Sequence, residues 1–202
     1  MWRINGGQME GSTSGTSPSL PGVILAGGAG RRIGGDKPLR MLAGKPLWQH
    51  VADRVAPQVS VLAVNAAEPL GLLQAVPDGR PGLGPLGGIL AAMLWAQGQG
   101  AERVLTVAVD TPFLPHDLVV RLAAADGIAI AETEDGLHGT TALWPVHLSV
   151  DLMQALASGT RKVTEWAASH PVSRVRFEDT TPPSFFNVNT EDDLSQAEKW
   201  LA

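Results

Sequence analysis

Short apolar runs alternate with helically spaced apolar positions along most of this chain. The runs predict strands at 22–26, 59–64, 104–109, 128–130, 140–144 and 172–177. Apolar residues three or four positions apart predict helices near 47–55, 86–94, 118–122, 148–156 and 194–201, and the 86–94 helix is expected to be strongly amphipathic. Strands that alternate with helices predict an α/β fold, a three-layer α/β/α sandwich with a mainly parallel, Rossmann-like central sheet.

Local signals set the expected boundaries of several elements. Pro46 is expected at the first position of the 47–55 helix, because its fixed φ suits a helix start. Thr190 and Asp193 have the spacing of a capping box that opens the last helix. The segment 77–88 is rich in Gly and Pro and too long for a plain connector, so it is expected to be a functional loop.

The chain length and its first residues indicate the domain organisation. The 202 residues suffice for one domain with a sizeable core. Residues 1–20 are rich in Gly, Ser and Thr and lack the apolar segment of a signal peptide, so we interpret them as a disordered tail. Residues 21–202 are then expected to form a single domain.

Composition excludes several classes of function. The net charge of −5 argues against nucleic acid as a partner, so any anion site must depend on local cations. The chain has no Cys, which excludes disulfides, thiolate metal sites and a catalytic thiol. No apolar run is long enough to span a bilayer, and no G-x-S-x-G motif is present. We expect a cytoplasmic enzyme without membrane partners, and none of the scattered histidines is assigned to a metal.

The most informative segment is Leu25–Lys37, which reads L-A-G-G-A-G-R-R-I-G-G-D-K and follows the first predicted strand. Glycines after a strand let backbone N–H groups approach phosphate oxygens, because no Cβ stands in the way. Arg31, Arg32 and Lys37 add cations, and Arg can bind phosphate with two hydrogen bonds. The spacing fits neither the P-loop nor the dinucleotide-binding fingerprint. The segment therefore predicts nucleotide binding with phosphoryl or nucleotidyl transfer.

A carboxylate follows the most apolar predicted strand. Asp110 comes directly after 104–109, and ligands of open α/β sheets bind beyond the carboxyl ends of strands. Mg²⁺ prefers carboxylate, water and phosphate oxygens, so Asp110 is the candidate metal ligand. The alternatives for Asp110 are a turn or a cap of the helix near Pro115.

A second carboxylate lies in the 77–88 segment. The side chain of Asp78 could accept hydrogen bonds from the N1–H and N2–H₂ edge of guanine. Gly87 and Gly88 are expected at the start of the next helix, whose N-terminus would then face the nucleotide.

These motifs together resemble the molybdenum cofactor guanylyltransferases. The resemblance begins at L-A-G-G-x-x-x-R-[hydrophobic]-G-x-D-K and continues in the order of that family over nearly everything after Pro21. Its further motifs are Gly44–Val51, Val64–Ala66, Pro77-Asp78, Gly84–Gly88, Val109–Pro112 and Asn187–Thr190.

The resemblance implies an activity and its substrates. Such an enzyme transfers GMP from GTP to the molybdopterin-bound molybdenum cofactor, giving the guanine dinucleotide cofactor and pyrophosphate, with Mg²⁺. It implies a nucleotide-binding half at about 21–112 and a molybdopterin-binding half at about 113–202. Cofactor-biosynthesis proteins and molybdoenzyme chaperones are further candidate partners.

The resemblance also implies roles for individual residues. Arg32, Lys37 and Asp110 are the catalytic candidates, and Asp110 is the metal ligand. The implied nucleotide contacts are Leu25, Ala26, Gly27, Gly28, Arg31, Lys37, Asn65, Asp78, Gly84, Pro85, Leu86 and Asp110. The implied contacts with molybdopterin are Arg161, Lys162, Asn187 and Asn189.

Each of the less specific candidates has a structural alternative. Asn65 could instead form a turn at a strand end, and Asn187 and Asn189 an Asx turn before the last helix. Arg161 and Lys162 could be an ordinary pair of surface charges.

Two other functions remain open from sequence. One is a sister nucleotidyltransferase that uses CTP with molybdopterin, or a sugar or polyol phosphate acceptor. The other is a non-catalytic module that binds GTP or the cofactor. Only an enzyme would release pyrophosphate.

Overall fold

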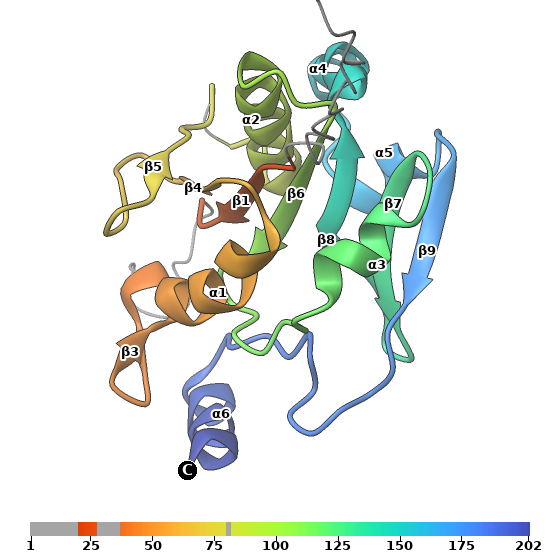
Figure 1. Ribbon diagram of the computed structural model, residues 1–202. Helices are drawn as coiled ribbons and strands as arrows, with labels where there is room; N and C mark the ends of the chain where they lie inside the picture. The colour runs from red at the N-terminus through yellow and green to blue at the C-terminus, as the bar shows by residue number, and fades with distance from the viewer. Residues whose placement is uncertain (1–19, 28–36, 80–81) are drawn as a thin grey trace, which may run out of the picture.

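A seven-stranded sheet forms the centre of the protein (Figure 1). The computed structural model describes residues 20–27, 37–79 and 82–202. The strand order is β5 (Gln74–Ala75), β4 (Leu62–Asn65), β1 (Gly22–Leu25), β6 (Arg103–Ala108), β8 (Gly136–Pro145), β7 (Ile128–Thr133) and β9 (Val172–Arg176). Among these strands β8 runs antiparallel to both of its neighbours, and the other neighbouring pairs are parallel. The predicted α/β fold with a mainly parallel sheet is confirmed.

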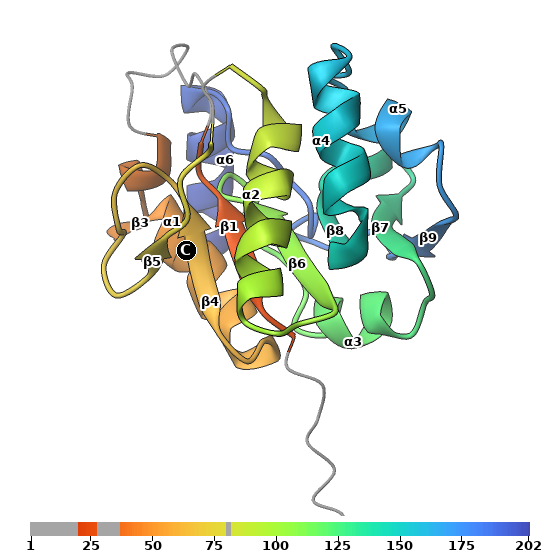
Figure 2. The same ribbon diagram turned by 90° about the horizontal axis from the view of Figure 1, so that it is seen from above.

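Helices cover both faces of this sheet (Figures 1 and 2). One face carries α2 (Pro85–Gly98), α4 (Ser149–Ala157) and α5 (Val163–Ala167), and the other carries α1 (Leu47–Val55) and α3 (Leu118–Ala123). The period-two alternation of a strand explains the two layers. In β1, Val23 and Leu25 pack with α2, whereas Ile24 packs with α1 and α3.

A third, smaller core joins the C-terminal helix to the segment that follows the glycine-rich loop. Here α6 (Glu191–Leu201) packs on the hairpin of β2 (Met41–Leu42) and β3 (Lys45–Pro46). The buried residues of this core are Leu42, Leu47, Phe113, Val188 and Ala197. The ring of Trp200 meets Phe113 and Phe186 edge to face, with centroids 5.8 and 4.9 Å apart. The last eleven helical residues thus pack against the first half of the chain.

The sequence predictions for α2 and the 77–88 segment need correction. The expectation of a strongly amphipathic helix is wrong, because α2 packs on both the sheet and α4 and is apolar nearly all round. Its apolar residues include Leu94, which is 44% exposed. The expected 77–88 loop is also too long, since α2 already begins at Pro85.

Smaller differences concern boundaries. β4 begins at Leu62, later than the expected start at 59, and Pro46 is the N-cap residue of α1 with extended backbone. The hairpin of β2 and β3 and the five-residue α5 were not predicted, because two- to five-residue elements carry almost no periodic signal. The capping box of Thr190 and Asp193 is confirmed.

The expected tail at 1–20 lies almost wholly outside the described residues. Its last residue, Leu20, accepts a backbone hydrogen bond from Ser60 N at 2.9 Å. Within the described part of the chain, every helix is too short or too polar to cross a bilayer.

Candidate active site

A cavity of about 400 Å³ opens at the carboxyl ends of β1 and β6. On one side of β1 the chain places β4 and then β5, and on the other side it places β6. The strand order therefore reverses at β1. Ligands of doubly wound sheets bind at such a reversal. The described lining residues are Leu25, Ala26, Gly27, Lys37, Pro38, Asn65, Gly84, Pro85, Ala108, Val109, Asp110, Thr140 and Asn187. Most of the residues predicted to contact the nucleotide therefore meet at one cavity.

Lys37 lies at the centre of the polar contacts in this cavity. Its Nζ donates to Asp110 Oδ2 at 2.6 Å and to Asn189 Oδ1 at 2.5 Å. The side chains of Lys37 and Asp110 are 21% and 16% exposed, so both remain accessible from the cavity. Lys37 is also the first residue of the short 3₁₀ helix η1 (Lys37–Leu39). A cation from the glycine-rich loop and a carboxylate from the turn after β6 thus meet at the predicted edge of the sheet.

The backbone around Asp110 is fixed on several sides. Val109 N donates to Leu25 O at 3.2 Å, which ties the segment to β1. Val188 N donates to the carbonyl oxygen of Asp110 at 2.9 Å, which ties it to the C-terminal segment. The alternative of a helix cap is wrong, because Asp117 is the N-cap residue of α3 and the Asp110 side chain binds Lys37.

Asn189 is held by the start of α6. Asp193 Oδ2 accepts from Asn189 N at 2.9 Å and from Thr190 N at 2.8 Å, and Thr190 Oγ1 accepts from Asp193 N at 3.1 Å. The N–H of Asn189 lowers the pKa of Asp193, and hydrogen bonds from Thr190 and the positive charge of Lys37 act in the same direction. Arg40 and Glu191 form a further ion pair between the same two segments. The amide oxygen of Asn189 therefore points at Lys37 from a well-anchored backbone.

Asn65 and Asp78 form the second polar pair near the cavity. Asn65 is the last residue of β4 and only 2% exposed, and its Nδ2 donates to Val76 O and Asp78 Oδ1, both at 2.8 Å. Asp78 itself is exposed. Asn65 thus does more than form the strand-end turn that was its alternative, because it holds the side chain predicted to recognise guanine.

The N-terminus of α2 borders the same cavity. Gly84 is its N-cap residue with φ of 64°, a backbone conformation that favours glycine, and Gly84 and Pro85 line the cavity. Leu86 was also predicted as a nucleotide contact, but its side chain is fully buried in the core. The N-terminus of a helix carries a partial positive charge, so this end of α2 suits a phosphate or another electron-rich group.

The four residues predicted to contact molybdopterin do not lie together. Asn187 lines the cavity and its Nδ2 donates to Phe185 O at 3.3 Å, while Asn189 binds Lys37. Arg161 instead donates to Leu156 O at 2.9 Å and Thr160 O at 2.7 Å. Lys162 is the exposed residue before α5.

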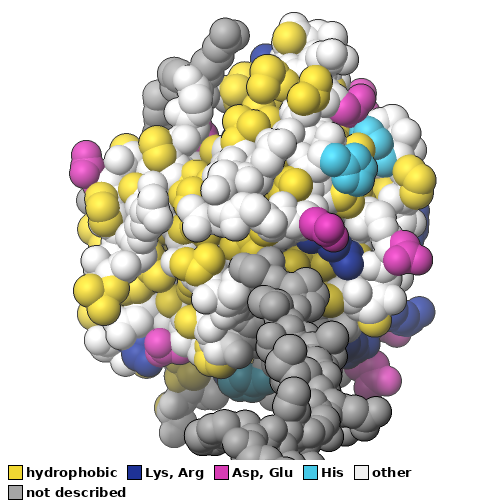
Figure 3. All heavy atoms as spheres, turned by 45° about the horizontal axis from the view of Figure 1, so that its top comes forward, with side chains coloured by type: hydrophobic (Ala, Val, Ile, Leu, Met, Phe, Trp, Pro, Cys, Tyr) yellow, Lys and Arg dark blue, Asp and Glu magenta, His cyan; other side chains and the backbone are white. Residues whose placement is uncertain are grey.

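Arg161 borders a second cavity that is mostly apolar. This cavity of about 870 Å³ runs between α2 and α4, and Figure 3 shows apolar side chains gathered on that face. Its lining includes Leu90, Leu94, Trp95 and Met153. The structure thus places Arg161 apart from the contacts of Lys37 and Asp110.

Some predicted residues cannot be placed, and four lining residues were not predicted as contacts, namely Pro38, Ala108, Val109 and Thr140. Gly28, Arg31 and Arg32 lie outside the described residues. Thr140 lines the cavity and was not singled out, because the sequence does not reveal that β8 runs antiparallel and so starts at this edge. Its position at the start of a predicted strand was a signal that could have found it.

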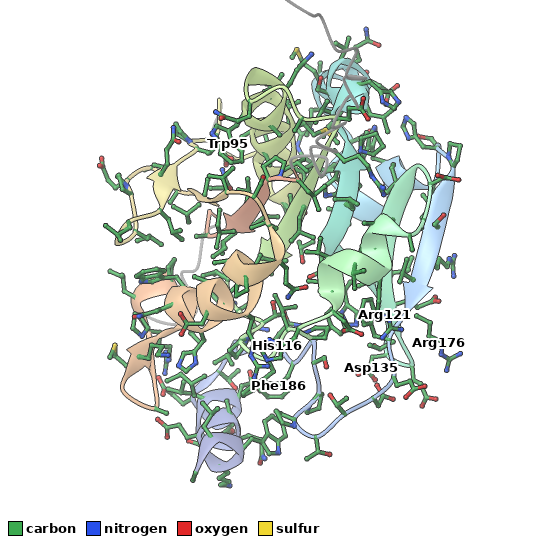
Figure 4. All side chains as sticks on the ribbon, viewed as in Figure 1. Trp95, His116, Arg121, Asp135, Arg176 and Phe186 are labelled. Atoms are coloured by element: carbon green, nitrogen blue, oxygen red, sulfur yellow. The ribbon has the colours of Figure 1, made fainter. Side chains whose placement is uncertain are left out.

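The histidines do not form a metal site within the described part of the chain, where no three His, Asp or Glu side chains cluster. His116 contacts Arg54, and in the view of Figure 4 it lies toward the lower end of the molecule, whereas Trp95 lies on α2 near the upper end. His138 stacks on Phe185, and burial lowers its pKa. A metal ion in the cavity would therefore depend on Asp110 together with substrate and water oxygens.

Comparison with known proteins defines the class. Residues 22–174 match the MobA-like NTP transferase domain. A protein named molybdenum cofactor guanylyltransferase from Bradyrhizobium sp. (strain ORS 278) is 44% identical over 205 residues, which cover 94% of this chain and 97% of that protein. A protein of the same name from Cereibacter sphaeroides is 44% identical over 190 residues, covering 90% and 97%.

A solved structure agrees with this match. The crystal structure of molybdopterin-guanine dinucleotide biosynthesis protein A from Archaeoglobus fulgidus has a TM-score of 0.72 and 27% identity, and the match covers 89% of this chain and 97% of that one. The fold and the sequence are those of a nucleotidyltransferase. More narrowly, the chain belongs to the MobA-like NTP transferase family, with relatives named molybdenum cofactor guanylyltransferase.

Proposed function

We propose that the cavity at Lys37 and Asp110 transfers GMP from GTP to the molybdopterin-bound molybdenum cofactor and releases pyrophosphate. The observation that carries this proposal is the placement of Lys37 Nζ between Asp110 Oδ2 and Asn189 Oδ1, at the carboxyl ends of the parallel strands. The names of the relatives support the choice of GTP and the cofactor as substrates.

The cavity offers separate positions for the two ends of GTP. Gly27, the N-terminus of α2 and Lys37 suit the triphosphate, because they combine open backbone, the positive end of a helix dipole and a cation. Asp78, held by Asn65, suits the guanine edge, since a carboxylate can accept from both N1–H and N2–H₂. Arg31 and Arg32 remain predicted contacts of the triphosphate.

The donor set fits a divalent ion such as Mg²⁺. Asp110 supplies one accessible carboxylate in the cavity, and Mg²⁺ usually takes one or two carboxylates with phosphate and water oxygens. Asp110 would hold the ion, whose charge would neutralise oxygens of the triphosphate. Lys37 would then exchange its contact with Asp110 for a contact with phosphate.

The reaction itself needs little proton transfer. An oxygen of the terminal phosphate of molybdopterin attacks the α-phosphorus, and the bond from that phosphorus to its bridging oxygen breaks, so that both bonding electrons leave with pyrophosphate. The attacking phosphate oxygen is already anionic, so no general base is required. The chain must align the two substrates and stabilise the charge that develops on the leaving group. Lys37 is the described cation placed to do so.

The second substrate would approach from the C-terminal side of the cavity. Asn187 and Asn189 lie there, which supports their predicted contacts with molybdopterin. Arg161 and Lys162 stay predicted contacts of its phosphate, and Arg161 would have to leave the two carbonyl oxygens that it now binds.

Pyrophosphate release tests this function against its alternatives. The assay uses GTP, CTP and ATP, each with and without molybdenum-loaded molybdopterin. We expect release only when GTP and the molybdopterin substrate are both present. Equal release with CTP would indicate the sister enzyme, and GTP binding without release would indicate a non-catalytic module.

A further inference from the structure

We infer that Asn65 is a positioning residue for base recognition, which acts by holding Asp78 rather than by donating a hydrogen bond to the nucleotide. The inference rests on the proposed function, in which Asp78 binds the guanine edge. It begins with the number of donors on the Asn65 amide. An Asn side chain has two N–H donors, and here both are used, on Val76 O and Asp78 Oδ1 at 2.8 Å each.

The orientation of the Asn65 amide follows from the chemistry of its partners. A carbonyl and a carboxylate oxygen only accept hydrogen bonds, so the amide nitrogen must face them. If the amide were flipped by about 180°, its oxygen, which cannot donate a hydrogen bond, would face both acceptors. Because Asn65 is only 2% exposed, such an unpaired arrangement would be costly. The nitrogen therefore has no free donor for a base or ribose.

Two glycines leave space for the oxygen atom of the Asn65 amide. A Cβ on Gly88 would lie 2.5 Å from Asn65 Oδ1, and a Cβ on Gly27 would lie 3.0 Å from it. Gly88 is in the first turn of α2, and Gly27 follows β1. The Asn65 side chain is thus wedged between the glycine-rich loop and α2, which gives Asp78 a rigid support.

The geometry leaves acceptor capacity on both oxygens of Asp78, because Asn65 uses only one of the two lone pairs of Oδ1. Oδ1 is held by Asn65, whereas Oδ2 lies 3.7 Å from where a Cβ of Gly27 or Gly87 would be. Longer side chains at either glycine would crowd Oδ2. We therefore expect Asn65 to fix the direction in which Asp78 presents its carboxylate, and so to set discrimination between bases.

The test compares GTP with ITP, which lacks the exocyclic amino group of guanine. The ratio of kcat/KM for GTP to that for ITP is measured in wild type, Asp78→Asn, Asn65→Ala and the double variant. We expect Asn65→Ala to lower this ratio by about tenfold, because a charge-assisted hydrogen bond that fixes the carboxylate is lost. In the Asp78→Asn background, Asn65→Ala should leave the ratio unchanged. Independent contacts with the nucleotide would instead give multiplicative losses.

A second pair of variants disturbs the amide without removing it. Gly88→Ala pushes against Asn65 Oδ1 and should also lower the GTP to ITP ratio. Gly98→Ala lies in the same helix with no heavy atom within 4 Å of the new Cβ, so it should leave the ratio unchanged. Thermal unfolding of all variants checks that each is folded, and Gly88→Ala decides the matter if Asn65→Ala does not fold.

The outcomes separate this inference from the proposed function. If Asp78→Asn lowers the ratio but neither Asn65→Ala nor Gly88→Ala does, the positioning role is wrong while base recognition by Asp78 stands. If Asp78→Asn leaves the ratio unchanged, base recognition by Asp78 is wrong and the role of Asn65 fails with it.

Discussion

The Nζ atom of Lys37 lies 2.6 Å from Oδ2 of Asp110, so an ion pair joins the glycine-rich loop to the turn after β6. Both groups border the cavity at the edge of the sheet. If a divalent ion binds Asp110, the ammonium group of Lys37 must move away from the carboxylate. It can then bind a phosphate of the bound nucleotide. The pair thus couples metal binding at Asp110 to the position of Lys37.

Replacing Lys37 should affect turnover much more than GTP binding. Removing a group that stabilises the leaving pyrophosphate typically lowers turnover by about 10²–10³. We expect a loss of this order in Lys37→Ala, with GTP affinity much less changed. Lys37→Arg should restore only part of the rate, because a planar guanidinium is longer and favours two acceptors.

Single-turnover kinetics and a GTP titration measure the two effects of Lys37. Lys45→Ala is the matched control, since Lys45 also forms a 2.6 Å ion pair, but with Asp53 in exposed positions. Unchanged turnover in Lys37→Ala would contradict its catalytic role.

The same ion pair predicts competition between Lys37 and a metal ion. In protein without nucleotide, Lys37→Met removes a positive charge beside Asp110, so Mn²⁺ alone should bind about tenfold more tightly. Titration followed by electron paramagnetic resonance measures the affinity, with Lys45→Met as the control. Identical Mn²⁺ binding in wild type and Lys37→Met would show that the ion does not use Asp110.

Asp110→Ala should abolish turnover in Mg²⁺ and leave the fold intact. The reason is that the loss of the metal ligand removes several kcal/mol of charge stabilisation at the phosphates. Turnover and circular dichroism of the variant are the measurements. Near-normal turnover with an unchanged Mg²⁺ requirement would mean that Asp110 has only a structural role.

Asp78→Asn should weaken the preference for GTP over CTP and ATP more than it lowers turnover. A carboxylate that accepts from two guanine donors is left with an unsatisfied oxygen when another base binds, at a cost of about 1–3 kcal/mol. Calorimetric titration with the three nucleotides tests this expectation. Equal affinity of the wild type for GTP and CTP would refute the assignment of Asp78.

Asp193 should make the stability of the protein depend on pH. The pKa of Asp193 is lowered in the folded protein, first by the N–H of Asn189. Its stabilising effect is therefore complete above the pKa of an unfolded Asp, about 3.9, and is lost as the pH falls through the lower folded-state pKa. Asp193→Asn should be less stable than wild type at neutral pH, and the difference should shrink in acid.

Urea unfolding across a pH series measures this difference. Asp192→Asn is the control, because Asp192 lies in the same first turn of α6 without the hydrogen bonds of the capping box. A constant difference between wild type and Asp193→Asn at all pH values would contradict the prediction.

Many positions at the carboxyl edge of the sheet follow from sequence because they depend on local rules. Buried parallel strands are continuous apolar runs, and residues just after them lie at the carboxyl edge, so Gly27 and Asp110 could be placed there in advance. The capping box of Thr190 and Asp193 is local in the same way, since it needs only residues three positions apart.

The tertiary structure decided which of these residues touch. Lys37 and Asn189 are 152 positions apart, and no local pattern pairs them. Their contact depends on α6 packing against the β2–β3 hairpin through the third core. Similarly, the antiparallel course of β8 brings Thr140 to the cavity, and the segment after α4 places Arg161 at the second, apolar cavity.

The sequence by itself thus determined the order of the longer elements, the carboxyl-edge site and the family, because these follow from periodicity, glycine at sites of close approach and motif spacing. Only the tertiary structure showed that Asn65 holds Asp78 and that Lys37 pairs with Asp110. Such pairings are set by long-range packing of strands and helices. A sequence pattern does not give the distance in space between residues that are far apart in the chain.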